Sequence, residues 1–256
     1  MSTPKVMYEL PHVRYLYVIK EVFHYGSISS AAAKVHISQP AATQSLARIE
    51  QLLNVRLFER QPKGMVPTEV GIIFERRLTR ILEHLRRGDS LARKKTIRST
   101  NGKITSSFHK HCSPVQFRAL LAITKTGSFK QAARELNVSQ PGIHRAMRDL
   151  ALLAGFSLFA QTRGGIELAP ATEVFVRQLR LAVSEFQQAI FEINEFLGQA
   201  TTRINLGSLP LSRVSILPSA INKLLSDVGA SVQVNCVDAR YPNLLKDLRF
   251  GDLDFI

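Results

Sequence analysis

Cysteine and long apolar runs are scarce in this 256-residue chain. Its two cysteines, Cys112 and Cys236, lie far apart in the sequence, which argues against a disulfide scaffold and for a reducing compartment. No apolar run approaches the ~18 residues that a transmembrane helix needs. The first stretch, MSTPKVMYELPHV, has neither the apolar core nor the cleavage site of a secretory signal. We therefore expect a cytoplasmic protein that is not attached to a membrane.

Motifs of catalysis and of metal binding are also missing. The sequence contains no GxxxxGK[ST], GxGxxG, HExxH or GxSxG pattern. His109, His111 and Cys112 lie close together, but they have no second ligand pair at zinc spacing, so we interpret them as loop residues. The sequence thus predicts no catalytic residues, no metal site and no cofactor.

Acidic residues are few relative to basic ones, with 20 Asp/Glu against 34 Lys/Arg and a net charge of +14. Most of the excess lies in residues 1–112, which hold 19 Lys/Arg against 8 Asp/Glu. Residues 113–200 hold 9 against 7, and residues 201–256 hold 6 against 5. Such an excess favours a polyanionic partner, either nucleic acid or an anionic membrane surface.

The chain repeats itself at an offset of 101 residues, without a gap. Ser-Gln-Pro occurs at 38–40 and at 139–141, and Gly-Ser at 26–27 and at 127–128. Leu-Phe follows each copy, at 57–58 and at 158–159. A match of this length at one fixed period indicates a duplicated folding unit.

Each copy has the pattern of a helix-turn-helix. In the first, Gly26 is expected to end one helix and Ser27 to cap the next, whose paired alanines allow another helix to cross closely. Ser38 is expected to cap a third helix, with Pro40 in its first turn, where proline costs no hydrogen bond. A Gly-containing segment after Leu-Phe then predicts a β-wing; in the second copy we assign this turn to Gly164 and the glycine after it.

These residues carry a family resemblance. The first copy, GSISSAAAKVHISQPAATQSLARIEQLLNVRLFERQPKGMVPTEVG, resembles the N-terminal winged helix-turn-helix of LysR-type transcriptional regulators. The second copy, GSFKQAARELNVSQPGIHRAMRDLALLAGFSLFAQTRGGIELAPA, resembles the same domain. Members of the family have one such domain, so the duplication is a departure. The second copy also departs at residues that normally support the wing, since Glu50, Arg60, Thr68 and Gly71 are replaced by Ala151, Gln161, Ala169 and Thr172.

The resemblance implies contact with double-stranded DNA. In the first copy the predicted DNA-binding residues are Ser27, Ser38, Gln39, Pro40, Thr43, Gln44, Arg48, Arg60 and Lys63, and Ser45 lies beside them. In the second copy they are Ser128, Ser139, Gln140, Pro141, His144, Arg145 and Arg148. Glutamine can pair with adenine and arginine with guanine, whereas wing cations suit phosphates or the minor groove. The alternative is that the Ser-Gln-Pro residues only cap and solvate a surface helix, and that His144 is a surface histidine.

A long apolar stripe follows each copy. Phe74, Leu78, Ile81 and Leu85 are spaced 4-3-4, and the second stripe runs over Phe175, Leu179, Ala182, Phe186, Ala189, Ile193 and Phe196. This spacing is typical of a coiled-coil seam. In the family a linker helix at this position pairs two subunits, so we predict a homo-oligomer, a dimer or a tetramer, through these helices. The alternative is a helix packed against its own chain.

The stretch from 93 to 112 is predicted to be a basic linker. Asn101 and Gly102 are a hairpin signal within it, and a flexible linker is an equal alternative. Beyond residue 200 the pattern changes to β-α-β-α-β, which indicates a parallel sheet. This part resembles the opening of the family's effector-binding domain, whose first-strand loop, here Ser208, contacts a small-molecule effector. The family's domain is much longer, so the chain is interpreted as a fragment or truncated product.

The predicted fold is mainly α: tandem winged helix-turn-helix domains with linker helices, followed by a partial α/β, periplasmic-binding-protein-like lobe. The expected domains are 8–92, the basic linker 93–112, 113–200 and the partial lobe 201–256. The expected function is that of a sequence-specific DNA-binding transcriptional regulator, effector-responsive in its full-length form. Two alternatives remain open: a non-specific architectural DNA-binding protein, and a small-molecule sensor whose second copy serves only assembly.

Overall fold

A computed structural model of the chain describes residues 10–97, 107–162, 165–199, 202–209, 215–228, 232–249 and 251–256. The chain divides into two compact bodies, Met1–Phe186 and Gln187–Ile256, which we call the N-terminal and the C-terminal body. Among the described residues, no helix has both the length and the apolar character needed to cross a membrane.

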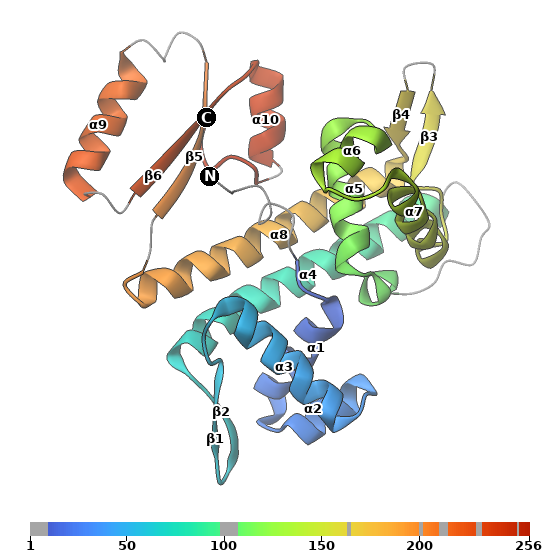
Figure 1. Cartoon of the computed structure of the whole chain (residues 1–256), viewed down its shortest axis with the longest axis vertical. Helices are drawn as coiled ribbons and strands as arrows, with labels where there is room; N and C mark the ends of the chain where they lie inside the picture. Colours follow the sequence, from blue (N-terminus) through green and yellow to red (C-terminus); the bar gives the residue numbers. More distant parts are fainter. Residues whose placement is uncertain are drawn as a thin grey trace. The chain divides into compact units, whose positions relative to one another are not determined.

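The N-terminal body contains one structural unit twice (Figure 1). The first repeat consists of α1 (Val13–Tyr25), α2 (Ile28–Val35), α3 (Gln39–Leu53), β1 (Phe58–Gln61), β2 (Gly64–Pro67) and α4 (Glu69–Ile97). The second repeat consists of α5 (Pro114–Thr126), α6 (Phe129–Glu135), α7 (Gln140–Ala154), β3 (Phe159–Thr162), β4 (Gly165–Leu168) and α8 (Pro170–Phe196). Each element of the second repeat begins 101 residues after its counterpart, as the sequence offset predicted.

The helix boundaries have the cap chemistry that the sequence indicated. Gly26 ends α1 with φ 59°, and the Ser27 side chain accepts a hydrogen bond from the backbone N–H of Ser30 at the start of α2. Gly127 and Ser128 do the same between α5 and α6, with φ 67° at the glycine. Positive φ is costly for residues with a Cβ, so glycine fits both turns.

Small residues allow the helices of each repeat to pack closely. Ala31 and Ala32 of α2 are buried, as are Ala132 and Ala133 of α6. In the first repeat the hairpin also packs on the α1–α2 turn, because the backbone N–H of Met65 donates to the Gly26 carbonyl at 2.8 Å. A Cβ at position 64 would collide with the same carbonyl oxygen, so glycine is required there.

The structure differs from the predicted basic linker at 93–112. Residues 93–97 belong to α4, and residues 108–111 form a 3₁₀ helix, η2 (Phe108–His111). The helix continues because its buried face continues, with Ala92 and Thr96 both buried. The hairpin signal at Asn101 and Gly102 lies outside the described residues.

Helix α4 and the part of α8 that belongs to the N-terminal body, residues 170–186, lie side by side and run antiparallel (Figure 1). The Arg77 guanidinium is 2.7 Å from the Glu185 carboxylate, and His84 Nδ1 is 2.9 Å from Gln178 Oε1. Except for Phe196, the predicted seam of α8 is buried within the single chain, and so is the stripe of α4. This part of the seam is therefore covered within one chain, which favours the alternative of a helix packed against its own chain, and formation of a homo-oligomer stays a prediction.

The C-terminal body has the predicted strand and helix order. It contains β5 (Thr202–Ser208), α9 (Ile216–Val228), β6 (Val232–Asp238) and α10 (Tyr241–Arg249). β5 and β6 pair in parallel, with Thr202 opposite Val232, as the β-α-β pattern requires. The predicted third strand amounts to one parallel bridge between Leu206 and Phe255 in the described part of the chain.

Candidate nucleic-acid interface

Helix α3 presents a polar face from a well-defined N-terminus. The Ser38 side chain accepts a hydrogen bond from the backbone N–H of Ala41, with Pro40 in the first turn. Gln44 and Arg48 are exposed, whereas the opposite face of α3 is buried in the repeat. The Thr43 hydroxyl is half-buried and donates to the Gln39 carbonyl at 3.0 Å.

Ser45 does not lie on the exposed face of this helix. It is 3% exposed, and its hydroxyl donates to the Ala41 carbonyl at 2.8 Å. The remaining predicted residues of the first turn, Ser38, Gln39 and Pro40, are exposed. The residues of α3 that are both predicted to contact DNA and exposed are therefore those at its N-terminus together with Gln44 and Arg48.

Helix α7 has the same N-terminal geometry but other side chains. Ser139 caps it by accepting from the backbone N–H of Gly142 at 3.2 Å. Arg145 and Arg148 are exposed, and so is His144. The His144 ring stacks face to face on Phe129, with centroids 4.3 Å apart and planes at 3°. This stacking holds the His144 ring against α6. The side chains of Arg145 and Arg148 are therefore less restricted in their conformation than that of His144.

The wing of the first repeat carries two exposed cations. β1 and β2 pair antiparallel, with Arg60 opposite Met65, and Lys63 lies in the turn between the strands. The Met65 bond to Gly26 anchors this hairpin to the helical part of the repeat. β3 and β4 pair in the same register in the second repeat, with Thr162 opposite Gly165. Arg163 and Gly164, at the predicted second wing turn, lie outside the described residues.

A buried carboxylate braces the first wing against α3. Glu50 is 7% exposed; one of its oxygens accepts from the backbone N–H of Leu57 at 2.8 Å and the other lies 3.0 Å from the Arg56 guanidinium. The Thr68 hydroxyl donates to the Arg56 carbonyl at 2.8 Å and accepts from the backbone N–H of Gly71 at 2.9 Å. These bonds join the end of α3, the start of β1 and the start of α4.

The second repeat lacks the acceptor and the hydroxyl that form this brace. Ala151 and Ala169 stand at the positions of Glu50 and Thr68, and the backbone bond is kept, from Ala169 N–H to the Leu158 carbonyl at 3.0 Å. Thr172 replaces Gly71, where a Cβ would collide with the Leu57 carbonyl oxygen. The second repeat thus has a different helix-to-wing junction, in the region where the sequence showed departures.

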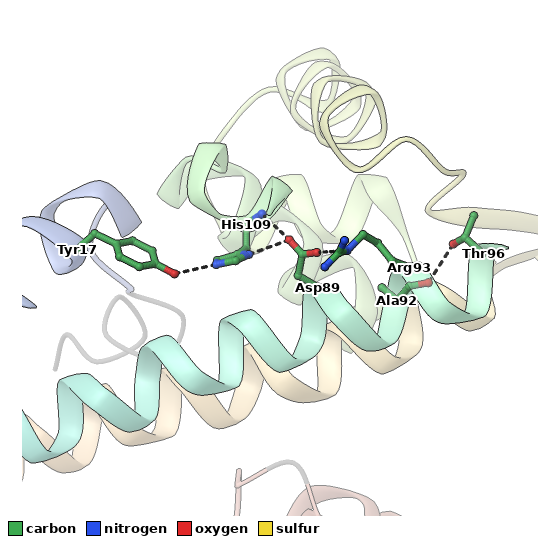
Figure 2. A network of polar contacts seen from close by, with 6 residues as sticks. All are labelled: Tyr17, Asp89, Ala92, Arg93, Thr96 and His109. Carbon is green, nitrogen blue, oxygen red and sulfur yellow. Dashed lines mark hydrogen bonds and ion pairs between the residues drawn. The ribbon is translucent and has the colours of Figure 1, made fainter. Parts of the chain in front are cut away.

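A buried polar network lies where the sequence suggested only loop residues (Figure 2). His109 Nδ1 is 2.7 Å from the Asp89 carboxylate, and Nε2 is 3.0 Å from the Tyr17 hydroxyl. A carboxylate only accepts, so Nδ1 carries the proton that it donates to Asp89. The other Asp89 oxygen lies 2.8 Å from Arg93 Nε. His109 is 1% exposed, so our interpretation of it as a loop residue is corrected, whereas His111 is exposed.

The network connects α1, α4 and η2, and the pKa values of Asp89 and Tyr17 within it depart from their usual values. Burial disfavours the Asp89 carboxylate, but the hydrogen bonds from His109 and the charges of His109 and Arg93 outweigh it, so the pKa of Asp89 is lowered. Burial raises the pKa of Tyr17 to about 12, while Arg86 opposes this shift and Asp89 adds to it. One signal for this site was present in the sequence, because Asp89 is the only acidic residue between 86 and 111.

The thiol at the end of η2 is not available for chemistry. Cys112 is buried and its thiol donates to the Phe108 carbonyl at 3.4 Å. Burial raises the pKa of this thiol, with a smaller contribution from Asp89. A protonated, buried thiol is a poor nucleophile and a poor metal ligand. Within the described ranges, no three side chains of the metal-binding types gather at one point.

Ser208, the predicted effector contact, ends β5. Its side chain is buried, and its hydroxyl donates to the Leu209 carbonyl at 3.1 Å. The residues that follow, 210–214, lie outside the described part of the chain, so an effector contact at this loop stays a prediction.

An N-capped recognition-type helix beside an antiparallel wing defines the winged helix-turn-helix class of fold. The family model for bacterial regulatory helix-turn-helix proteins of the lysR family matches residues 13–72 and again residues 114–173. Both matches begin and end at the same places of the two repeats. Each repeat of the chain is therefore a match to the helix-turn-helix domain of the lysR family.

Curated relatives support this assignment. The HTH-type transcriptional regulator GalR of Pseudomonas putida is 27% identical over 248 residues, which is 97% of this chain and 60% of that protein. The regulator PcaQ of Agrobacterium fabrum is 30% identical over 145 residues, which is 56% of this chain and 46% of PcaQ. The chain therefore spans about half to three fifths of the relatives' length, and the alignment with GalR includes both repeats. These relatives are regulators and not enzymes.

Two solved structures show a likeness to parts of the chain. A variant of full-length OxyR from Pseudomonas aeruginosa is 22% identical, covers 56% of this chain and 49% of that chain, and has a TM-score of 0.41. The complex of the CbnR DNA-binding domain with DNA is 33% identical over 34% of this chain and 92% of that chain, with a TM-score of 0.28.

Proposed function

We propose that the chain is a sequence-specific, DNA-binding regulator of transcription in the cytoplasm. The observation that carries this proposal is the exposed polar face of α3 beside a wing with two exposed cations. Capped helix N-termini and Arg/Lys side chains bind phosphates, while glutamine and arginine on the same helix read base edges. The net charge of +14 supports a polyanionic partner.

Within this proposal the two repeats have different roles. Residues Gln39, Gln44 and Arg48 of α3 read bases or phosphates, and Arg60 and Lys63 hold the backbone at the wing. Arg145 and Arg148 of α7 supply a second, weaker reading surface. The C-terminal body supplies part of an effector-binding domain that makes the full-length protein responsive to a small molecule.

The test uses the full chain and a pool of random duplexes. We expect repeated selection to enrich one sequence, and the ratio of its affinity to that of scrambled DNA to exceed about 10³ at physiological salt. The salt dependence of each affinity, measured by fluorescence anisotropy, gives the number of phosphate contacts. A chain that binds all duplexes equally, with a steep salt slope, would be an architectural protein instead. Failure to bind any duplex, together with stabilisation by a small molecule, would favour the sensor hypothesis.

A further inference from the structure

The contacts between α4 and α8 are reciprocal under the repeat offset. Arg77 contacts Glu185, and His84 contacts Gln178. The counterpart of Arg77 in the second repeat is Gln178, and the counterpart of His84 is Glu185. Position 77 of the first repeat thus contacts the copy of position 84, and position 84 contacts the copy of position 77. This reciprocity is the property of an isologous interface in a twofold-symmetric dimer, here formed within one chain.

A glycine allows the two helices to approach closely. Gly88 lies inside the 29-residue helix α4, where glycine is about 1 kcal/mol less favourable than alanine. A Cβ at Gly88 would lie 2.9 Å from the Gln178 Cβ and 3.1 Å from the Phe175 ring. The counterpart of Gly88 in α8 is Ala189, which is also small and is fully buried. The close approach of α4 and α8 at this point therefore requires a glycine at position 88.

One backbone hydrogen bond that joins each repeat to the start of its long helix is the same in both repeats. The backbone N–H of Thr68, next to the start of α4, donates to the Leu57 carbonyl at 3.0 Å. The backbone N–H of Ala169, next to the start of α8, donates to the Leu158 carbonyl at 3.0 Å. If both repeats are joined alike to helices that are related by a twofold, then α3 and α7 are related by the same twofold.

The two reading helices nevertheless carry different side chains. Thr43 and Gln44 of α3 correspond to His144 and Arg145 of α7, and Arg48 corresponds to Asp149. A symmetric homodimer presents two identical readers and so selects a palindrome. Two unlike readers in a dimer-like arrangement select two unlike half-sites in inverted orientation.

We propose that the two repeats of a single chain act together as the two DNA-binding domains of a dimer would. One copy of the chain then binds a non-palindromic duplex with two unlike, inverted half-sites. This inference rests on the proposed DNA-binding function. It replaces pairing of two subunits through the long helices by pairing of two repeats, because the apolar stripes that a second subunit would need are covered within the chain.

The first experiment measures stoichiometry and footprint on the duplex obtained by selection. Native mass spectrometry or sedimentation is expected to find one chain per duplex. Hydroxyl-radical footprinting is expected to show two protected segments, with centres separated by about 10 bp or a multiple of it. Scrambling the weaker half-site is expected to lower affinity about tenfold, less than the usual gain from two linked sites because the second repeat holds DNA weakly. Two chains per duplex, or full affinity for one half-site alone, would overturn the inference.

The second experiment breaks the interface and repairs it. Glu185→Arg places a cation beside Arg77 and Arg80, whose guanidinium groups lie 2.7 Å and 3.9 Å from the Glu185 carboxylate. We expect affinity for the complete site to fall about tenfold, to the level of the single strong half-site, whose own affinity is unchanged. The double variant Arg77→Glu/Glu185→Arg is expected to recover most of the loss.

Controls separate this inference from misfolding and from failure of the proposed function. Glu83→Arg introduces the same charge on the exposed face of α4 and is expected to leave the ratio of complete-site to half-site affinity unchanged. Thermal melts identify any variant that does not fold, and the double variant then carries the test. A folded Glu185→Arg chain with an unchanged ratio would overturn the inference, whereas absence of sequence preference in the wild type would overturn the proposed function first.

Discussion

The two repeats share a backbone and differ in the chemistry at the junction of helix and wing. In the first repeat, Glu50 and Thr68 join α3, β1 and α4 through side-chain hydrogen bonds. In the second, the corresponding residues are alanines, yet β3 and β4 pair in the same register. The hairpin therefore forms without the brace, from strand pairing and packing. The brace adds side-chain hydrogen bonds between the wing and the helices to a hairpin whose strands already pair.

The two repeats also differ in where their charges lie. Arg48 and Arg60 of the first repeat correspond to Asp149 and Gln161 of the second, and Lys63 corresponds to a glycine. The braced repeat is thus also the one with more cations in its wing, whereas the helix of the second repeat, α7, carries the two arginines Arg145 and Arg148. A duplicated domain can divide its labour in this way, with one copy supplying affinity and the other adding sequence discrimination.

The largest expected effect comes from removing the cations of the first repeat. The triple change Arg48→Ala, Arg60→Ala and Lys63→Ala should weaken DNA binding strongly and flatten its salt dependence by about one for each lost phosphate contact. Affinity measured between low and physiological salt gives both quantities. The reverse change in the second repeat, Asp149→Arg with Gln161→Arg, adds cations and should make the affinity depend more steeply on salt. An unchanged affinity and slope in the triple variant would show that the first repeat does not hold the DNA backbone.

A smaller loss is expected when the brace is removed. Glu50→Ala leaves the buried Leu57 N–H without its acceptor, which costs about 2 kcal/mol of unfolding free energy. Glu50→Gln keeps an acceptor for this N–H and should lose less. Chemical denaturation measures both, and the salt slope shows whether a loosened wing still contacts phosphates. If both variants are as stable as the wild type, the brace does not explain the difference between the repeats.

Most of the fold could be predicted because its signals are local. The Gly-Ser turns and the Ser-Gln-Pro caps each act within a few residues, and the structure places them as expected. The β-α-β order spans more of the chain, but each of its elements has its own local pattern. The repeat at an offset of 101 residues strengthened these predictions, since a signal that occurs twice is less ambiguous than one that occurs once. The structure leaves most of the candidate DNA-contact residues exposed but buries Ser45, because burial on a helix depends on what packs beside it, and their contact with DNA stays a prediction.

What could not be predicted depends on contacts between distant residues. The stripe of α8 has the pattern of a seam, but periodicity does not reveal whether the partner helix belongs to the same chain. Asp89, His109 and Tyr17 are separated by up to 92 residues, and no motif connects them. Only the tertiary structure brings a lone acid in a basic stretch to a histidine with which it pairs.

The buried network ties the first repeat to the segment before the second, and the counterpart of Asp89 in the second repeat is the apolar Ile190. Asp89→Asn should lower the free energy of unfolding by about 1 kcal/mol at pH 7, because a charged acceptor for His109 is lost. The folded pKa of Asp89 lies below the unfolded value near 3.8, so its stabilisation is present above that pH and is lost as pH falls through the folded pKa. The free energies of unfolding of the wild type and of Asp89→Asn, measured by denaturation between pH 3 and 7, should therefore become more alike toward the acid end. A difference between variant and wild type that does not change with pH would contradict this role.

The smallest expected effect, and the one that decides the role of the second repeat, is that of changing His144 and Arg145 together to alanine. His144 stacks on Phe129, so its base contact is restrained, and Arg145 is the freer reader of guanine. Phosphate contacts dominate affinity while base contacts specify, so affinity should fall only about threefold. Footprinting beside the wild type should show protection shortened at the second half-site. An unchanged footprint would leave the second repeat as a structural partner of the first, and total loss of binding would make it the principal reader.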